Sequence, residues 1–306
     1  MEIKSIVTIL FLSMLGLSLG ANASTISSDE PWVDATEGIT GGSTAITWFP
    51  ANQNSSSSST LDHAQTIIEV YTATWCETCI PAEEALNVSI TDHAVKVVKY
   101  HRHLFETEDP FGNNNTEGRW LSRYGPSAVQ SDFNARTPPT VIFGGERMHI
   151  GSHPTAGVSL EEEYSISLNS IMRPPISNSS EFTFTWEDGT FEWSWNWEED
   201  ITACRSNCDT VSTELYMMIV EDTAFFPEGS NGEEYYHRIL RDVIPLGNNS
   251  IEYILPQAWD DDDVSILIVL DWQESQSEET FLEVIPSLAV ELVIIGLVFT
   301  AFITPI

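Results

Sequence analysis

Two cysteines three positions apart are the residues of this sequence whose types and spacing best suit chemistry. They are Cys76 and Cys79 of the stretch WCETC, which lies between a β-branched run and a helical pattern. The N–H groups at the start of a helix favour a thiolate, so Cys76 is predicted to attack a disulfide and Cys79 to resolve the mixed disulfide. A bare C-x-x-C also suits a structural bridge or half of a zinc site, but no second C-x-x-C completes such a site. We therefore predict a redox-active Cys76–Cys79 pair.

A second pair, Cys204 and Cys208, lies in the stretch CRSNC in the half of the chain that is rich in strand patterns. Paired cysteines outside the cytoplasm tend to be oxidised, so a small structural disulfide is predicted there. The alternative is a second redox pair that feeds Cys76, because short-loop bridges are more easily reduced.

Two other groups could in principle bind a metal ion. His101 and His103 alternate at a strand end and would face one side, and four aspartates follow one another at 260–263. Exposed polar residues and a solvated acidic turn are the better interpretations, because no EF-hand spacing surrounds the aspartates. No metal and no cofactor is therefore expected.

The elements that position Cys76 and Cys79 follow a β–α–β alternation. Residues 66–72 (TIIEVYT) are β-branched and aromatic, which predicts a buried strand, and residues 94–100 predict a second one. Between them, apolar residues recur at helical spacing over 77–88. The pair is therefore expected where a buried strand turns into a helix.

The rest of the first half continues this alternation. Residues 101–136 are a long polar stretch, and Gly144 and Gly145 predict a hairpin turn. Ser159 and Glu162 form a capping box that opens a helix, and two prolines end it. The expected elements are a helix at 116–124, strands at 140–143 and 147–150, and a helix from 160 to about 171.

After residue 180 the hydrophobic period becomes two. Aromatic residues alternate on both sides of Asp188-Gly189, which predicts a hairpin whose aromatic face is a sandwich core rather than a carbohydrate-binding surface. Further strands are expected at 213–220, 251–255 and 264–270. Several short strands in about 100 residues indicate an antiparallel β-sandwich.

With these elements in place, the sequence resembles the thioredoxin superfamily. The resemblance rests on Trp75 before the pair, on the C-x-x-C itself, and on Pro139-Thr140 at the head of the strand TVIF. It implies that Pro139 is a cis-proline beside the cysteines, and that Trp75, Pro139 and Thr140 bind extended substrate. It covers residues 65–173.

Two features depart from the pattern of that superfamily. Its buried acid should lie six residues before the first cysteine, where this chain has Val70, and strand alternation points the neighbouring Glu69 to the opposite face. The stretch 101–136 is also longer than the minimal fold requires and is interpreted as an insertion.

The layout of the whole chain is similar to surface proteins described as outer-membrane-protein-related, which join a thioredoxin-like domain to a β-sandwich. The matching pieces are residues 72–86, Asp109-Pro110-Phe111, residues 219–222 and residues 235–247.

Charge and the two ends of the chain bear on location. The 306 residues carry a formal net charge of −34, which excludes nucleic acid as a partner. Residues 1–23 are predicted to be a secretory signal peptide. Residues 284–306 carry one charged residue, Glu291, and predict a transmembrane helix or a processed anchor, with a buried helix as the alternative.

The body of the protein is therefore expected outside the cytoplasm, secreted across the membrane and anchored at the cell surface. N-x-S/T sequons suit a glycoprotein and occur at Asn22, Asn54, Asn87, Asn114, Asn178 and Asn248. Residues 24–64, rich in Ser, Asn and Gly, are predicted to be a flexible lead-in, with a short strand near 46–49.

The expected fold is thus an α/β thioredoxin-like domain (65–173), a linker (174–180) and an all-β sandwich (181–280) before the segment 284–306. The leading functional interpretation is a membrane-anchored thiol–disulfide oxidoreductase outside the cytoplasm, which exchanges electrons with protein thiols and an unidentified donor or acceptor. Glu77 and the acidic chain disfavour the thiolate, which predicts a reductase or isomerase rather than a strong oxidant. The alternative is a surface binding or adhesion protein with a permanent disulfide.

Overall fold

A computed structural model describes residues 30–205, 208–247 and 249–275. Residues 31–275 lie within one compact unit. The helices are α2 (Cys79–Ser89), α3 (Asn114–Arg123), α4 (Gly125–Gln130) and α5 (Leu160–Asn169), with short 3-10 turns at Leu61–His63 and Ile201–Ala203. The strands are β1 (Val33–Asp34), β2 (Gly41–Pro50), β3 (Ser55–Thr60), β4 (Gln65–Thr72), β5 (Val95–His101), β6 (Thr140–Phe143), β7 (Arg147–Ile150), β8 (Glu181–Glu187), β9 (Thr190–Asn196), β10 (Thr210–Phe225), β11 (Tyr235–Pro245), β12 (Ser250–Glu252) and β13 (Val264–Ser275).

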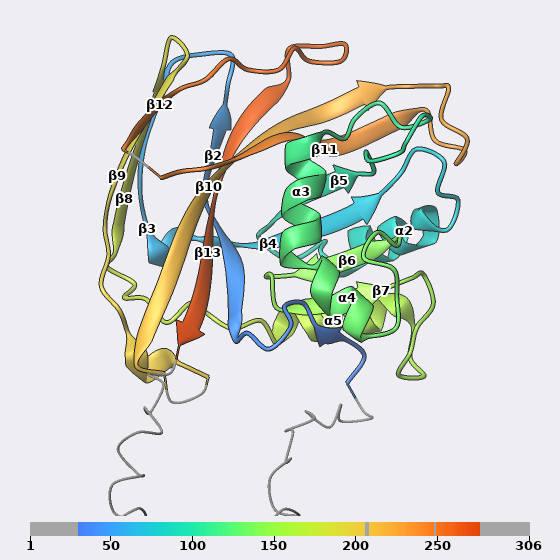
Figure 1. The fold of residues 1–306 in the computed structure, drawn as a ribbon, viewed down its shortest axis with the longest axis horizontal. Coiled ribbons are helices and arrows are strands. Elements are labelled where there is room, and N and C mark those ends of the chain that lie inside the picture. The colour runs from blue at the N-terminus through green and yellow to red at the C-terminus, as the bar shows by residue number, and fades with distance from the viewer. Residues whose placement is uncertain (1–29, 206–207, 248, 276–306) are drawn as a thin grey trace, which may run out of the picture. The chain divides into compact units, whose positions relative to one another are not determined.

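Most strands belong to one sheet that closes on itself. Its order is β1-β7-β6-β4-β2-β13-β10-β11-β5, and β5 also pairs with β4. The strands β4, β2, β13, β10, β11 and β5 therefore form a closed six-stranded barrel, to which β6, β7 and β1 are added at β4 (Figure 1). Closure removes the free edges that an open sheet would leave on these six strands.

The unit β4–α2–β5 forms as the alternation predicts. β4 and β5 run parallel, with Val70 opposite Lys99, and α2 makes the crossover. Ile68 and Val70 pack with Ala82 and Leu86 of α2, whereas Ile67 and Tyr71 face the other way. The β-branched run is buried on both faces, which explains why its hydrophobic residues form a continuous run instead of alternating with polar ones.

The barrel interior is apolar in its middle and polar beneath α3. Its apolar part is formed by Ala45, Ile67, Tyr71, Val98, Tyr100, Met218, Val220, Leu240, Leu267 and Val269. Near α3, Arg119 pairs with Asp271 at 2.7 Å and with Glu69 at 3.4 Å, and both carboxylates are nearly or fully buried. These pairs tie α3 to strands β4 and β13.

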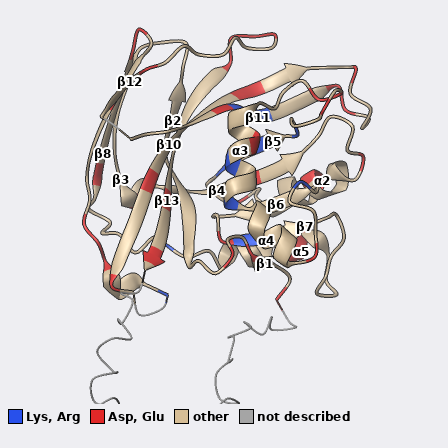
Figure 2. Cartoon of the chain, viewed as in Figure 1, with Lys and Arg blue, Asp and Glu red and all other residues tan. Residues whose placement is uncertain are grey.

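The buried Glu69 also receives hydrogen bonds from the hydroxyls of Tyr100 and Tyr124. The prediction that Glu69 faces away from Val70 is thus confirmed. Asp271 also pairs with Arg123 at 2.9 Å, and Arg119 and Arg123 together hold the pKa of Asp271 below its ordinary value although burial opposes this. Figure 2 shows the basic residues of α3 set among acidic residues that are spread over strands and loops.

A second sheet, in the order β12-β9-β8-β3, packs against the outer face of β2, β10 and β13. The predicted hairpin at Asp188-Gly189 joins β8 and β9, with positive φ angles of 48° and 85° at these two residues. Its alternating aromatics fill the core between the sheets, as predicted: Phe182, Phe184, Trp186, Phe191 and Trp193 are buried there.

The predicted fold class is wrong. The structure is mainly β, with only four α-helices in the part of the chain that it describes, and it holds no separate α/β thioredoxin-like domain. The reason is strand pairing: β10, β11 and β13 lie in the predicted sandwich region, but in the structure they complete the barrel with β2, β4 and β5. Local periodicity predicts a strand but does not identify the strand with which it pairs.

The predicted lead-in also differs from the structure. Residues 41–50 form β2, which is mostly buried and pairs with β13 along its length. The serine run forms β3, which pairs with β8, so low side-chain complexity did not prevent regular backbone pairing.

The predicted signal peptide and the segment 284–306 lie outside the described residues. Among the helices that are described, none combines the length and the apolar character needed to span a bilayer.

Candidate functional site

The cysteine pair lies in the turn that joins β4 to α2. The sulfurs of Cys76 and Cys79 are bonded to each other, and their Cα atoms are 5.3 Å apart. Two backbone hydrogen bonds shape the turn, from the N–H of Cys76 to the carbonyl of Ala73 (3.0 Å) and from the N–H of Cys79 to the carbonyl of Cys76 (3.1 Å). Cys76 is 3% exposed and Cys79 is fully buried. Any reagent therefore meets Cys76 first.

The helix begins later than the sequence suggests. Cys79 is the first residue of α2 and Thr78 is its cap, so Cys76 precedes the first turn by three residues. The field of a helix N-terminus falls off within about one turn, so Cys76 receives less stabilisation of a thiolate than expected. The polar group near the Cys76 sulfur is the hydroxyl of Thr78, at a distance of 3.5 Å.

Trp75 is fixed beside the pair by polar contacts. Its indole N–H donates to Glu106 at 2.9 Å, and the guanidinium of Arg102 lies 5.5 Å from its ring centre. Burial opposes ionisation of Glu106, but hydrogen bonds from Trp75 and from the backbone N–H groups of Thr107 and Glu108 lower its pKa. A charged Glu106 therefore holds the indole in one orientation at neutral pH.

Pro139 follows a cis peptide bond after Pro138, as the resemblance implied, and it is buried. Thr140 opposes Tyr71 in the β4–β6 register, so Pro139 lies at the sheet edge where the chain leaves β4 toward the cysteines. The hydroxyl of Thr140 donates to the carbonyl of Thr137 at 2.6 Å. The structure thus places Trp75, the cysteine pair and Pro139 at one edge, with the Thr140 hydroxyl bonded within its own loop.

A buried aspartate that the sequence analysis did not assign to the site holds this turn in place. Asp109 Oδ2 accepts hydrogen bonds from the backbone N–H of Thr74 (2.9 Å) and from His101 Nδ1 (2.8 Å). The side chains of Asp109 and His101 are both fully buried. The stretch predicted to be an insertion therefore supports the cysteine turn.

The second half of the chain holds the same turn from the other side. The carbonyl oxygen of Thr74 accepts from the N–H of Asn231 at 3.1 Å, and the Tyr236 hydroxyl lies 3.2 Å from it. A Cβ atom on Gly229 would come within 2.0 Å of that hydroxyl, so only glycine lets this loop approach so closely. No local pattern predicts these contacts, because they join residues more than 150 positions apart.

A small cavity lies beside the first turns of α2. It has a volume of about 130 Å³, and Glu83, Lys99, His101 and Tyr236 are among the residues that line it. Glu83 forms an ion pair with Lys99 and accepts a hydrogen bond from Thr72. Within the described residues, the buried Nε2 atom of His101 has no hydrogen-bond partner. The cavity is therefore lined by charged and polar side chains.

The second cysteine pair is also bonded in the structure. Cys204 and Cys208 are joined and pack at the rim of the core between the two sheets. Their sulfurs and a carboxylate oxygen of Glu274 lie within 4.8 Å of one another. Two thiolates and a carboxylate are zinc ligands, but the bonded sulfurs offer no thiolate.

No protein-family model and no curated protein matches the sequence. Among solved structures, protein AGR_C_4864 from Agrobacterium tumefaciens is 14% identical over 66% of this chain and 77% of its own, with a TM-score of 0.39. HBP35 of Porphyromonas gingivalis is 14% identical over 68% of this chain and 63% of its own, with a TM-score of 0.32. Likenesses this weak assign neither a fold nor a function.

The predicted membership of the thioredoxin superfamily, and the similarity to outer-membrane-protein-related surface proteins, are therefore not supported by these comparisons, and the barrel contradicts the fold that they implied. The resemblance is therefore not evidence for an oxidoreductase activity. Any such activity has to be argued from the cysteine pair itself.

Proposed function

We propose that the Cys76–Cys79 pair carries out thiol–disulfide exchange with protein substrates. In the reduced form, the Cys76 thiolate attacks one sulfur of a substrate disulfide and the other substrate sulfur leaves as a thiol after taking a proton. The Cys79 thiol then loses its proton and attacks Cys76, which releases the second substrate thiol. The substrate gains two electrons and two protons, and the pair reaches the bonded state that the structure contains. An external dithiol returns it to the reduced form.

The observation that carries this proposal is the asymmetry of the pair. Cys76 has a small exposed surface in a turn next to Trp75, whereas Cys79 is fully buried at the start of α2. An outer attacking sulfur and an inner resolving sulfur are the arrangement that two successive exchanges need. Asp109, Asn231 and Tyr236 hold the turn from two sides through Thr74, by contacts that do not involve the two sulfur atoms.

The direction of electron flow follows from the surroundings of Cys76. The residue precedes the first turn of α2, Glu77 is its neighbour, and the chain carries a formal charge of −34. Its position before the helix weakens the stabilisation of a thiolate, and the two sources of negative charge oppose a thiolate. A less stabilised thiolate gives a lower reduction potential. We expect a potential nearer to the roughly −270 mV of protein reductants than to the roughly −120 mV of strong oxidases. Titration against glutathione or dithiothreitol measures it.

A binding or adhesion protein with a permanent disulfide is the second candidate. The observation that favours it is the low exposure of Cys76, which is only 3%. A disulfide that never opens in the folded protein would serve the turn as a structural cross-link.

Thiol labelling separates the two candidates. The folded protein is treated with a mild dithiol and then with an alkylating reagent, and the labelled sites are mapped by mass spectrometry. Exchange predicts that Cys76 is alkylated without unfolding, and that the wild type, but not Cys76→Ser, reduces insulin. Cys79→Ser should accumulate a mixed disulfide with substrate. If Cys76 is labelled only in denaturant, the proposed function is wrong and the structural disulfide stands.

We further propose that the exchange takes place outside the cytoplasm, where protein disulfides persist. Four sequon asparagines, Asn54, Asn87, Asn114 and Asn178, are exposed and accessible to glycosylation. Secretion and anchoring depend on residues 1–23 and 284–306 and stay predictions. The mass of the mature protein, compared with that of the full chain, tests cleavage at both ends.

A further inference from the structure

The barrel has an open mouth on the side away from the cysteine pair. β4 leads to the cysteines from its carboxyl end, whereas Lys96 lies near the amino end of the parallel strand β5. A pocket of about 730 Å³ opens there, lined by residues of five of the six barrel strands and of the segment after α2. Mouths of β-barrels are common ligand sites, and this volume suits a small molecule.

Two cations face this pocket without a carboxylate partner. Lys96 and Arg238 both line it, and neither forms an ion pair with any residue that the structure describes. Many of the other basic side chains do form one: Lys99, Arg102, Arg119, Arg123, Arg136, Arg173 and Arg241. In a chain with 46 acidic residues, two unpaired cations in one pocket form an unusual combination.

These two cations also affect each other. Burial and the neighbouring charge of Arg238 lower the pKa of Lys96. The ammonium group of Lys96 lies 4.9 Å from the ring centre of Trp48, which offers a weak cation–π contact but no counter-charge. An anionic group bound between Lys96 and Arg238 would relieve both effects.

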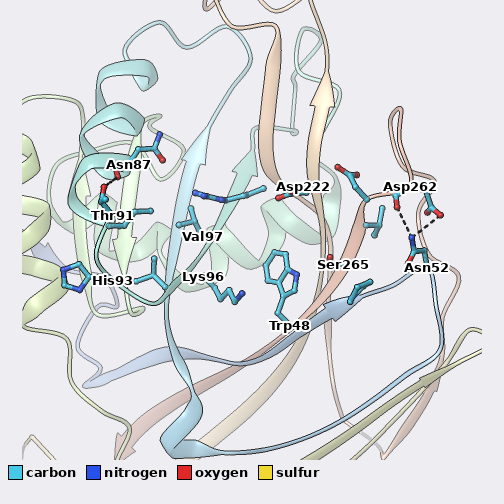
Figure 3. Close-up of a pocket in the computed structure, with 16 residues that line it drawn as sticks. Trp48, Asn52, Asn87, Thr91, His93, Lys96, Val97, Asp222, Asp262 and Ser265 are labelled. Atoms are coloured by element: carbon cyan, nitrogen blue, oxygen red, sulfur yellow. Dashed lines mark hydrogen bonds between the residues drawn. The ribbon is translucent and has the colours of Figure 1, made fainter.

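The pocket also contains acidic residues. Asp222, Asp262 and Asp263 line it, and Figure 3 shows Lys96 and Trp48 on one side with Asp262 on the other. The Oδ2 atom of Asp263 accepts from the N–H of Thr223 at 2.8 Å, but its buried Oδ1 has no partner in the part of the chain that the structure describes. Burial, followed by Asp222 and Asp260, raises the pKa of Asp263. This oxygen can therefore accept a hydrogen bond from a further donor or a cation.

We propose that the mouth of the barrel binds a small zwitterion, an amino acid or a short peptide, with its carboxylate between Lys96 and Arg238 and its ammonium group toward Asp263. The carboxylate of such a molecule pairs with Lys96 and Arg238, and its ammonium group pairs with Asp263. It is neutral overall, so the strongly negative charge of the chain does not repel it, as it would a simple anion. The site is independent of the cysteine chemistry.

Calorimetric titration of the whole protein tests the proposal. The probes are L-alanyl-L-alanine and the common free L-amino acids, with propionate as the matched anion and ethylamine as the matched cation. We expect at least one zwitterion to bind at least about tenfold more tightly than either single-charge control, because each control leaves one charged partner unsatisfied. If no zwitterion binds, or if propionate binds as tightly as the best zwitterion, the proposal is wrong.

Matched variants assign the two ends of the ligand. Lys96→Met keeps the stem over Trp48 and removes the charge, and Asp263→Asn removes the opposite charge. Each should weaken zwitterion binding at least about tenfold. Arg173→Gln also removes one positive charge but lies outside this pocket, and it should leave binding unchanged. Circular dichroism checks that each variant is folded. Unchanged binding in folded Lys96→Met would overturn the assignment.

Discussion

At the scale of single residues, Asp109 shows how a buried carboxylate supports the cysteine turn. One oxygen accepts from the Thr74 N–H and His101 Nδ1, and the other accepts from the N–H of Phe111. Asp109→Ala leaves these donors without their acceptor, so we expect it to lower the free energy of unfolding by about 3 kcal/mol. Urea denaturation measures this loss.

The exposed Asp92→Ala serves as the control for Asp109→Ala and should change stability by less than about 0.5 kcal/mol. A second readout is the rate at which a mild dithiol reduces Cys76–Cys79, which should rise in Asp109→Ala because the turn opens more often. Wild-type stability together with a wild-type reduction rate would show that Asp109 does not hold the turn.

Glu146 predicts a pH dependence of stability. Burial raises its pKa from 4.5 to about 7, and its Oε2 atom has no partner among the described residues. Because the folded protein favours the neutral acid, this stabilisation is complete below about pH 4.5 and is lost as the pH rises through about 7. Glu146→Gln cannot ionise, so it should match the wild type below about pH 4.5 and exceed its stability above about pH 7 by up to about 3 kcal/mol.

Urea denaturation of Glu146→Gln and the wild type at several pH values checks this difference. The exposed Glu252→Gln is the control and should follow the wild type across the range. A constant difference between Glu146→Gln and the wild type at all pH values would contradict the titration and indicate a packing effect.

At the scale of elements, the N-terminus of α3 has a reciprocal capping box, which the other described α-helices lack. The side chain of Asn113 accepts from the N–H groups of Asn115 and Thr116, and the Thr116 hydroxyl oxygen accepts from the backbone N–H of Asn113. The Asn113 side-chain amide also donates to the carbonyl of Arg241. Asn113→Ala should therefore cost about 2 kcal/mol, because it removes both the cap and the link to β11.

Ser159→Ala is the matched control, since Ser159 caps α5 with one hydrogen bond to the N–H of Glu162. It should cost about 1 kcal/mol or less. Thermal unfolding of both variants checks that Asn113→Ala loses more stability than Ser159→Ala. An equal loss would mean that the Arg241 contact contributes little.

The sequence predicted individual elements well where the signal was local. Gly144 and Gly145 turn β6 into β7 with φ angles of 61° and 68°, and Ser159 caps α5 as expected. The strand β3 could not be predicted, because its serines carry no hydrophobic pattern and pair only through their backbone with β8. The predicted helix begins at residue 77, whereas α2 begins at Cys79, because the residues from Cys76 to Cys79 form a hydrogen-bonded turn that apolar spacing does not distinguish from a helix.

At the scale of the whole molecule, the closed barrel predicts that neither half folds alone. A fragment of residues 31–175 lacks β10, β11 and β13, and with them Met218, Val220 and Leu267 of the interior. We expect this fragment to show no cooperative thermal transition by circular dichroism and little dispersion of its amide resonances. The described body, 31–275, should show both.

Mixing this fragment with residues 176–275 should restore native-like spectra, because the two pieces contribute complementary strands. A fragment 31–175 that melts cooperatively by itself would show that the predicted α/β domain is autonomous after all. The candidate site depends on the same pairing. Its cysteines could be found from their spacing, but Asn231 and Tyr236 reach the turn only because the barrel closes.

Strands β2, β10 and β13 have one face in the barrel and the other against the second sheet. Ile266 and Ile268 project into the core between the sheets, whereas Leu267 and Val269 project into the barrel. Neighbouring positions of one strand thus belong to different hydrophobic interiors. A shift of this strand that repairs a cavity on one side would displace side chains on the other. A substitution in these strands should therefore be compensated only when the packing is preserved both in the barrel and in the core between the sheets. Because the two interiors share these strands, a calorimetric scan should show a single heat-absorption peak rather than two.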